Sequence, residues 1–391
     1  MPALDGMRIL DMTQYEAGTS CTQALAWMGA DVVKIEAPGG GDPGRGPTGN
    51  AEYFVVWNSN KRSVAIDLKS EAGRDLFMQL LPKFDIFVEN YGPGVIEKLR
   101  LTYDDLRKHK QDIIYARLKG FGVEGPWSSY KCYDMVAQAA AGAFSITGEA
   151  DGPPMRPGPT TGDAGTGVQM ALALSAAYIQ KMRTGAGQYI ELSMQEAMTY
   201  YLRTATSGGR FGERAAGRSG NGGGPNMTLY PCKGGGPNDY VYVMAVTPKM
   251  WQAVLGVIHS ARQDAEPQGW PGAEDRDRLR GEISNWTSQR TKYEAMKELA
   301  EAGVPASAVL STQELYLNEH LVERGFVHEV DHPIHGQIKL MGWPAKMSAS
   351  EVAIEAAPLL GEHTANVLNE ELGLDDDELS RLVTAGVVGI D

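Results

Sequence analysis

The chain has 391 residues, 42% of them hydrophobic and 22% charged, a length that predicts two structural domains. Its 36 Lys and Arg against 49 Asp and Glu give a net charge of −13, which excludes nucleic acid and anionic membranes as expected partners. The three cysteines, Cys21, Cys132 and Cys232, are scattered, and the chain shows neither a secretory leader nor a run of 18 apolar residues. We therefore expect a cytoplasmic protein.

The first half of the chain alternates short apolar runs with amphipathic stretches, which is the pattern of βαβ units and a largely parallel sheet. Strands are predicted at residues 7–12, 31–36, 63–67, 85–89 and 112–116, and helices at 20–27, 72–83 and 94–99. This order predicts a doubly wound, Rossmann-like α/β domain. Ligands bind such sheets at the carboxyl ends of the strands, so the loops 13–19 and 90–94 are candidate walls of a site.

Two phosphate-binding motifs are missing from the sequence. No GxGxxG follows the first strand and no GxxxxGK[ST] loop occurs, so NAD and ATP are not expected. The sequence also lacks CxxC, HExxH and a close histidine cluster, and we expect no metal site. His332 and His335 stand in a Pro- and Gly-rich hairpin and are predicted to be surface residues.

The second half of the chain contains a long segment rich in glycine and arginine, from 208 to 236. A long loop of this kind is usually functional or a linker. After it, a strand is predicted at 240–244, a helix at 249–258 and a strand at 304–310. The predicted domains are a large Rossmann-like part, a linker with a glycine loop, a small α/β domain, and a linker that returns to the large domain, at residues 1–190, 191–225, 226–310 and 311–391.

A serine or cysteine nucleophile has little support in this sequence. Such a nucleophile needs a base in reach, most often histidine. Of the seven histidines only His109 precedes residue 259, and the GxSxG elbow is absent. Cys132, beside Lys131, is more typical of a buried structural thiol than of an activated thiolate.

A carboxylate nucleophile needs no base, because its ordinary pKa of about 3.9 leaves it ionised at neutral pH. Asp163 stands in the run Thr-Gly-Asp-Ala-Gly-Thr-Gly at 161–167, before an apolar stretch at 168–179 that predicts a helix. The glycines permit close approach of a substrate, and the N–H groups at a helix start favour negative charge. The same residues fit an ordinary N-cap aspartate equally well, and the local sequence leaves both interpretations open.

A series of ordered motifs runs over nearly the whole chain. They are 33–36, 58–63, 88–94, Tyr133-Asp134 with Ala137-Gln138, the Gly162-Asp163 turn, 183–188 and 358–364. In this order they resemble the family III CoA-transferases, a group that includes formyl-CoA transferase, carnitine CoA-transferase and the related α-methylacyl-CoA racemases. The resemblance implies an enzyme that moves coenzyme A from an acyl-CoA to a carboxylic acid.

The resemblance also assigns roles to individual residues. The family's catalytic aspartate, which forms aspartyl anhydride and aspartyl-CoA thioester intermediates, falls on Asp163. Tyr133 is placed near the thioester. The loop that covers the active site in formyl-CoA transferase is similar to Gly222, Gly223 and Gly224, and its closure would exclude water. The positions implied to contact CoA, which is a substrate and not a permanently bound cofactor, are Ile66, Lys69, Asn90, Lys98 and Lys131.

Several positions depart from formyl-CoA transferase. The family enzyme has His and Gln in the first loop where this chain has Gln14 and Glu16, which are expected to form part of the active-site wall. It also has Arg at Ala37 and Trp at Pro47, and its CoA-binding Arg is replaced here by Lys98, which loses the bidentate fork. Because a negative Glu16 would repel a small dianion, a bulkier monoacid or a different placement of the acceptor's carboxylate is expected.

Two alternatives to the transferase remain open at this stage. A racemase of the same family needs a His before the Asp of the 133–134 pair, whereas this chain has Tyr133, whose ordinary pKa of about 10 suits α-proton abstraction poorly. A non-catalytic CoA-binding subunit of a heteromeric transferase would not need Asp163 or the glycine loop. This chain retains both Asp163 and the glycine loop.

The family's proteins are interlocked homodimers, so the resemblance implies an interlocked homodimer here, with residues from about 330 onward returning to the large domain. The donors it suggests are succinyl-CoA, acetyl-CoA or another short acyl-CoA. The acceptors range from dicarboxylates to aromatic or steroid acids.

Overall fold

The computed structural model describes residues 1–259, 270 and 272–390. The chain divides into two compact units. The larger unit contains residues 1–144, 156–215 and 325–391, and the smaller one contains 145–155 and 216–324. The sequence predicted domain boundaries after residues 190, 225 and 310, whereas the chain passes from one unit to the other after residues 144, 155, 215 and 324.

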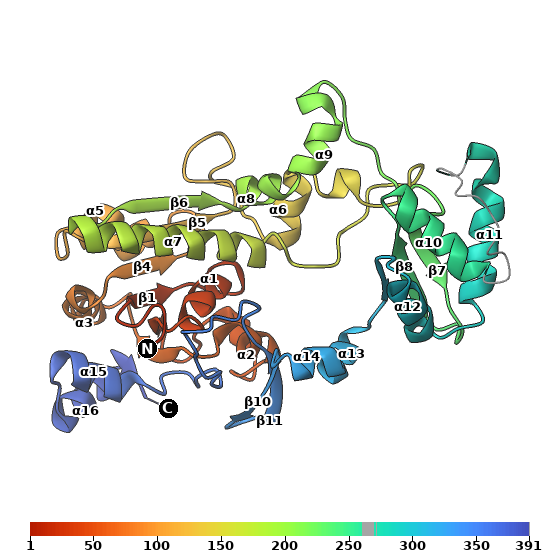
Figure 1. Cartoon of the computed structure of the whole chain (residues 1–391). Coiled ribbons are helices and arrows are strands. Elements are labelled where there is room, and N and C mark those ends of the chain that lie inside the picture. The colour runs from red at the N-terminus through yellow and green to blue at the C-terminus, as the bar shows by residue number, and fades with distance from the viewer. Residues whose placement is uncertain (260–269, 271, 391) are drawn as a thin grey trace. The chain divides into compact units, whose positions relative to one another are not determined.

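The larger unit is built on a seven-stranded sheet whose order is β12-β3-β2-β1-β4-β5-β6. The six strands from β3 to β6 in this order are mutually parallel, and β12 pairs antiparallel with β3 at one edge. This order confirms the predicted parallel α/β sheet (Figure 1). The strands are β1 Arg8–Met12, β2 Asp31–Glu36, β3 Arg62–Ile66, β4 Ile86–Glu89, β5 Ile114–Lys119, β6 Tyr189–Ser193 and β12 Val388–Gly389.

Helices cover both faces of this sheet because successive strand residues point to opposite sides. On one face, Ile9 and Val32 pack with α1 (Ala17–Ala26), α7 (Ala164–Thr184) and α8 (Met194–Tyr201). On the other face, Leu10 and Val33 pack with five helices. These are α3 Glu71–Leu80, α4 Val95–Leu99, α5 Tyr103–Arg107, α15 Thr364–Leu372 and α16 Asp376–Thr384.

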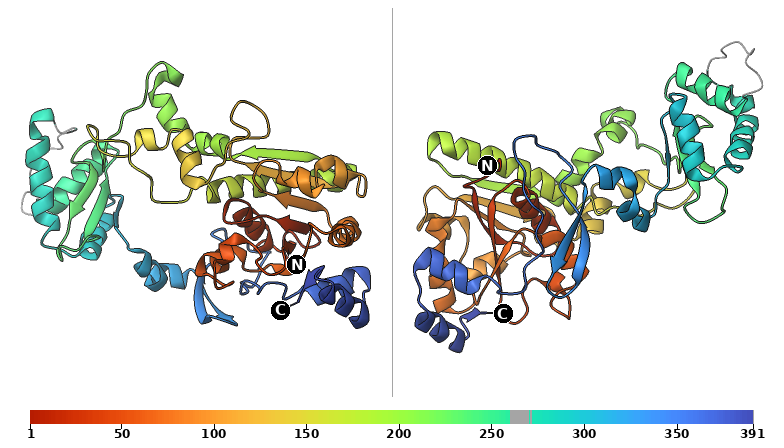
Figure 2. Two further views of the ribbon diagram at one scale, coloured as in Figure 1. Left: turned by 180° about the vertical axis from the view of Figure 1, so that it is seen from behind. Right: turned by 60° about the horizontal axis from the view of Figure 1, so that its bottom comes forward.

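The C-terminal segment returns to the strand that begins near residue 62. The amide of Ala65 donates to the Thr364 hydroxyl at 3.0 Å, and β12 extends the sheet beside β3. In both views of Figure 2 the last helices lie against this part of the larger unit. The remaining elements of the unit are α2 Glu52–Asn58, α6 Asp134–Ala140, α9 Arg203–Gly208 and the hairpin β10 Val327–His332 with β11 Gly336–Met341.

The smaller unit has a three-stranded antiparallel sheet of order β7-β8-β9 with its own apolar core. The predicted strand 240–244 is confirmed as β8, whereas the strand predicted at 304–310 shortens to β9. The strands are β7 Met227–Pro231, β8 Tyr240–Met244 and β9 Ala306–Ala308. The helices are α10 Pro248–Ile258, α11 Arg276–Thr287, α12 Lys292–Glu301, α13 Thr312–Leu317 and α14 Glu319–Glu323.

One surface prediction is wrong. His332 is buried, because the β10–β11 hairpin folds its ring inward and its Nδ1 accepts the amides of Ile334 and His335. Among the described residues, no group of three or more His, Cys, Asp or Glu side chains is arranged to hold a metal ion. Within the same residues, no helix has both the length and the apolar character that crossing a bilayer requires.

Candidate functional site

A cavity of about 220 Å³ opens at the carboxyl edge of the large sheet, where the loops after β1, β4 and β5 meet the start of α7. This is the position that the doubly wound topology predicts for a ligand. Five of the predicted site residues line it together: Gln14, Asn90, Lys131, Tyr133 and Asp163. Met194 and Leu118 add apolar wall.

Asp163 is the residue immediately before helix α7, as predicted, but its side chain does not cap that helix. Its φ and ψ of −87° and −69° are already helical, so the turn 160–163 continues into α7. The amides of Ala164 and Gly165 donate to the carbonyls of Thr160 and Thr161. The capping interpretation is therefore wrong for this side chain, and Asp163 instead lines the cavity.

The Asp163 carboxyl is not an ordinary acid in this setting. Its side chain is 8% exposed, and burial, together with the nearby Glu16 and Asp134 carboxylates, raises its pKa to about 7. The expectation of an unperturbed, fully ionised carboxylate is thus wrong. The physical reason is that the amides at the helix start are already bonded within the turn, so they leave burial and like charge unopposed.

The three glycines around Asp163 are required by packing within the protein. A Cβ on Gly162 would lie 2.7 Å from the Asp134 carbonyl oxygen, and one on Gly165 would lie 2.8 Å from the Tyr201 ring. A Cβ on Gly167 would lie 2.0 Å from the Ser20 hydroxyl on α1. The glycines thus let α7 and its leading turn approach neighbouring elements closely.

An acidic residue outside the predicted set fixes the turn that carries Asp163. The Asp134 carboxylate accepts the Asp163 amide at 3.0 Å and the Gln138 side-chain amide at 2.8 Å. Gln138 also donates to the Pro159 carbonyl at 2.9 Å. Together these bonds tie helix α6 to both ends of the turn.

Glu16 contacts the same turn from the first loop and is not part of the cavity lining. It is buried, it accepts the Thr160 hydroxyl, and the Tyr53 hydroxyl lies 3.4 Å from its other oxygen. Burial raises the pKa of Glu16, the Thr160 hydrogen bond lowers it, and the Asp134 charge raises it again. Glu16 therefore acts on the site from behind Asp163.

The first loop is held to the strand β4 side of the cavity by a reciprocal pair of hydrogen bonds. The Gln14 backbone amide donates to Asn90 Oδ1 at 2.7 Å, and Asn90 Nδ2 donates to the Gln14 backbone carbonyl at 2.8 Å. Next to it, the Tyr15 ring meets the Tyr133 ring edge-on, with centroids 5.8 Å apart. Tyr133 itself is 60% exposed.

The remaining positions implied to contact CoA lie outside this cavity. Ile66 and Lys69 line a second cavity of about 560 Å³ at the carboxyl ends of β2 and β3. Gln14 and Tyr91 border both cavities. Lys98, an exposed residue of α4, lines neither of them, and Gly222, Gly223 and Gly224 belong to the smaller unit.

Other wall residues were missed from the sequence. Lys119 lies at the carboxyl end of β5 and pairs with Glu89 at 2.9 Å, so the strand-end rule could have found it. Asp134 follows Tyr133 directly within a quoted motif. No feature of the sequence indicated Met194 as a wall residue. Cys132 also lines the cavity, but burial, together with Asp163 and Asp134, raises the pKa of its thiol to about 11, so it is not a thiolate at neutral pH.

The chain is similar to known proteins over almost its full length. The profile of CoA-transferase family III matches residues 4–364. A formyl-CoA:oxalate CoA-transferase of Streptomyces coelicolor is 39% identical over 99% of both chains. One from Rhodopseudomonas palustris is 37% identical over 99% of this chain and 97% of the relative.

Solved structures agree with this similarity. A CAIB/BAIF family protein from Brucella suis is 26% identical with a TM-score of 0.83 over 95% of this chain and 99% of that one. Rv3272 from M. tuberculosis is 26% identical with a TM-score of 0.77 over 93% and 98%. On the family match and the identity to these relatives, the chain belongs to CoA-transferase family III.

Proposed function

We propose that this CoA-transferase moves coenzyme A from an acyl-CoA thioester to a carboxylic acid with Asp163 as its nucleophile. The observation that carries the proposal is the Asp163 carboxyl itself, which is buried, does not cap its helix, and lines a cavity at the ligand-binding edge of the sheet. The resemblance that assigns the aspartate to this position supports it. The 37–39% identity to named CoA-transferases supports the overall reaction.

In the first half-reaction the Asp163 carboxylate attacks the acyl carbon of the donor and expels CoA as its thiolate. The thiolate then attacks the aspartyl carbonyl of the resulting anhydride, which forms an aspartyl-CoA thioester and releases the donor acid. In the second half-reaction the acceptor carboxylate attacks this thioester, which forms a second anhydride and expels the CoA thiolate. The thiolate then attacks the acceptor's acyl carbon, which forms the product thioester and frees the Asp163 carboxylate. Each step breaks one acyl bond and forms another, so no proton donor is needed.

Burial and the neighbouring acids Glu16 and Asp134 favour acylation of Asp163. An aspartate whose pKa is about 7 is a stronger nucleophile than an ordinary carboxylate. Acylation also removes the negative charge that Glu16 and Asp134 disfavour. The site thus destabilises the free carboxylate relative to the neutral anhydride and thioester.

The two cavities suggest a path for the CoA chain. The nucleotide end would lie near Ile66 and Lys69, and the thioester end near Asn90, Lys131 and Asp163. Gln14 and Tyr91 line both cavities. Lysine ammonium groups suit the phosphates of CoA. Lys98 would act from outside these cavities, and closure of the loop Gly222–Gly224 would protect the anhydride from water.

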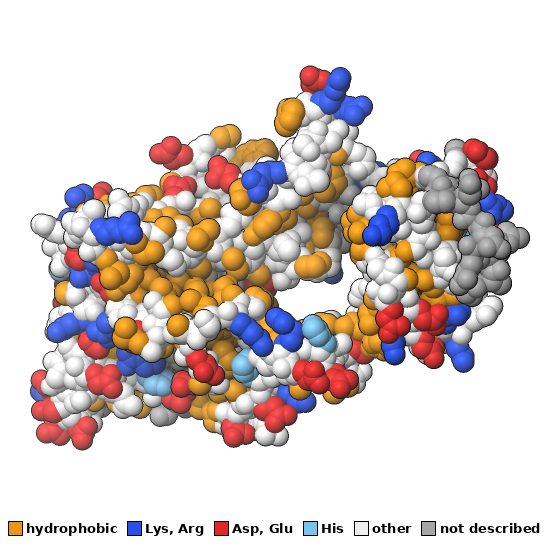
Figure 3. Space-filling model, in the orientation of Figure 1, with side chains coloured by type: hydrophobic (Ala, Val, Ile, Leu, Met, Phe, Trp, Pro, Cys, Tyr) orange, Lys and Arg blue, Asp and Glu red, His pale blue; other side chains and the backbone are white. Residues whose placement is uncertain are grey.

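An exposed apolar stripe on α7 supports the proposed homodimer. Leu172 and Met182 are each 73% exposed, and Val168 and Ile179 lie on the same side of the helix at helical spacing. Figure 3 shows hydrophobic side chains gathered over this part of the larger unit. A second copy of the chain would bury this stripe, and an interlocked arrangement in the cytoplasm stays our prediction.

The relatives' names make formyl-CoA and oxalate the first substrate pair to test. Ala37, where the family enzyme has Arg, borders the second cavity and offers no cation there. That cavity is the proposed place of the CoA nucleotide, so the choice of acceptor depends on Glu16, whose buried acid near Asp163 favours an acceptor with one carboxylate over a small dianion. Succinyl-CoA and acetyl-CoA stay among the proposed donors.

The proposal is tested by a CoA-exchange screen followed by mass spectrometry. Acyl-CoA donors are incubated with a panel of mono- and dicarboxylates, and new CoA thioesters are counted for the wild type and for Asp163→Ala. The proposal predicts exchange that the substitution abolishes, with Asp112→Ala, an acid at the opposite sheet edge, as control. Full activity of Asp163→Ala would contradict it, and α-proton exchange in deuterated water without CoA exchange would indicate an isomerase.

A further inference from the structure

Six charged side chains that the proposed chemistry does not use are buried beneath the first loop of the site. Each of them is at most 4% exposed. They come from β1, β2 and the segment that connects β2 to β3: Asp11, Lys34, Glu36, Asp42, Arg45 and Lys61. Three cations and three anions make the cluster neutral.

The six charges form three ion pairs. Lys34 Nζ lies 3.0 Å from Asp42 Oδ2, and the Lys61–Asp11 pair has the same distance. The guanidinium of Arg45 contacts Glu36 at 2.7 Å. Buried pairs of this kind are often no more stabilising than apolar side chains of the same volume. Stability alone therefore does not account for this cluster.

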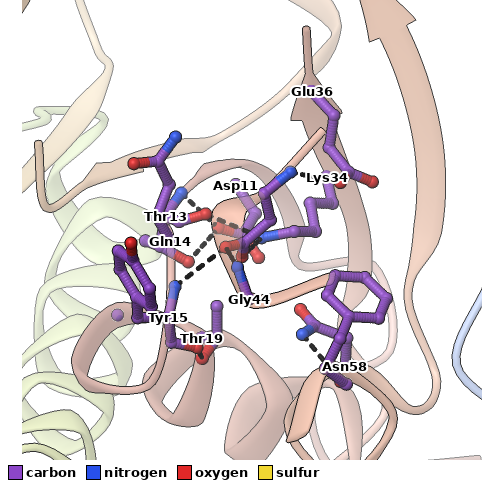
Figure 4. Close-up of polar contacts among 12 residues, drawn as sticks. Asp11, Thr13, Gln14, Tyr15, Thr19, Lys34, Glu36, Gly44 and Asn58 are labelled. Atoms are coloured by element: carbon purple, nitrogen blue, oxygen red, sulfur yellow. Dashed lines mark hydrogen bonds and ion pairs between the residues drawn. The ribbon is translucent and has the colours of Figure 1, made fainter. Parts of the chain in front are cut away.

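The cluster instead binds the backbone of the first loop. Lys34 Nζ donates to the Thr13 carbonyl at 2.7 Å, and Asp42 Oδ1 accepts the Tyr15 amide at 3.0 Å. From below, Asp11 accepts the Thr13 amide at 2.8 Å. Figure 4 shows Lys34 reaching toward the loop from β2.

The loop adopts a backbone conformation that has to be held. Tyr15 has a φ of +59°, in the left-handed region that residues other than glycine seldom occupy. On either side of it, Gln14 is bonded to Asn90 and Glu16 to Thr160. Gln14 and Tyr15 line the same cavity as Asp163. If the loop lost its contacts from below, the positions of Gln14 and Tyr15 relative to Asp163 would change.

We propose that Lys34 and Asp42 are positioning residues, whose ion pair fixes the Thr13 carbonyl and the Tyr15 amide so that the first loop keeps its place against Asp163. This inference rests on the proposed role of Asp163 as nucleophile. The pair acts through the loop backbone and does not touch the cavity.

The test is the double variant Lys34→Met with Asp42→Asn. It keeps both side-chain volumes and removes one charge of each sign, so Asp11–Lys61 and Glu36–Arg45 remain paired and the fold is retained. The matched control is Lys181→Met with Asp85→Asn, which removes a pair of the same types, 2.8 Å apart, at the opposite end of the strands.

Three quantities are measured in all three proteins. They are the rate of Asp163 acylation by an acyl-CoA in a single turnover, the KM for acyl-CoA, and the amide hydrogen exchange of residues 13–16. We expect acylation to fall about 100-fold in the double variant, the effect of a displacement of roughly 1 Å. The KM for acyl-CoA should change little, and exchange of the loop should rise. The control should match the wild type in each respect.

Wild-type rates and wild-type exchange in the double variant would overturn the inference, as would an equal loss in the control. The two proposals fail in different ways. If the wild type shows no acylation at Asp163, the proposed function is wrong, and the exchange of residues 13–16 still decides whether the pair holds the loop.

Discussion

The Asp163 amide donates a hydrogen bond to the Asp134 carboxylate at 3.0 Å, so one acid holds the backbone of another. The bond fixes the turn that carries the proposed nucleophile, and it also brings a second negative charge to the site. Glu16 adds a third acid through Thr160. Asp134 therefore contributes both to the position of Asp163 and, together with burial and Glu16, to its raised pKa.

Glu16→Gln should move the acid limb of activity to lower pH. Burial, Glu16 and Asp134 raise the pKa of Asp163 to about 7, so the wild type gains kcat/KM as pH rises through that value and the carboxylate forms. Removing the Glu16 charge lowers the pKa of Asp163, and the limb should shift by about one pH unit. The measurement is kcat/KM for CoA exchange between about pH 5 and pH 9.

The control for this prediction is Glu52→Gln, an exposed acid of the neighbouring helix α2. Its profile should overlay that of the wild type. A limb that stays in place in Glu16→Gln, or moves to higher pH, would show that Glu16 does not act on Asp163 through its charge.

Asp163→Asn should be more stable than the wild type at alkaline pH. A carboxyl whose pKa is raised on folding contributes its full stability below its unfolded pKa, and this contribution is lost as pH rises through about 7. Each pKa unit corresponds to about 1.4 kcal/mol, so the advantage of asparagine should grow by several kcal/mol between about pH 4 and pH 8. Urea unfolding at both values measures it, and a pH-independent difference would refute a raised pKa of Asp163.

Gly167→Ala should destabilise the larger unit by about 1–3 kcal/mol or more. The new methyl group would lie 2.0 Å from the Ser20 hydroxyl and 2.7 Å from the Ala17 carbonyl oxygen, so α7 must move away from α1. Gly158→Ala is the control, because nothing lies within 4 Å of its added Cβ. Denaturant midpoints of the two variants should differ clearly; equal midpoints would mean that the helices tolerate the displacement.

Leu172→Glu should weaken self-association. Its side chain is 73% exposed in one chain and belongs to the apolar stripe on α7, so a carboxylate there would be buried in a dimer without a partner. Light scattering after size-exclusion chromatography measures the mass. Gln180→Glu adds the same charge elsewhere on the helix and should leave the mass unchanged, and a dimer that survives Leu172→Glu would place the interface on another surface.

The sequence predicted the parallel sheet well, because a buried strand such as Ile86–Glu89 carries a short apolar run that local pattern identifies. Helix ends were less accurate. Helix α1 begins at Ala17, three residues before the predicted start, because tertiary packing buries its Gly- and Thr-rich first turn. His332 was misplaced for a similar reason, since the hairpin's own amides bond its ring.

The site was predicted in part. The topology and the family motifs brought Asn90, Lys131 and Asp163 to one cavity. Neither predicts the raised pKa of Asp163, because that depends on Glu16 and Asp134, which are distant in sequence and meet only in the fold. The Lys34–Asp42 pair is likewise a contact between a strand and a loop that no local pattern records.

The central claim is tested most directly by trapping the acyl-enzyme. The wild type is incubated with an acyl-CoA and no acceptor, treated with hydroxylamine or borohydride, digested, and analysed by mass spectrometry. The account predicts that Asp163 alone carries the modification, which is lost in Asp163→Asn. CoA exchange that proceeds at the normal rate with Asp163 unmodified, or with the label on another residue, would contradict it.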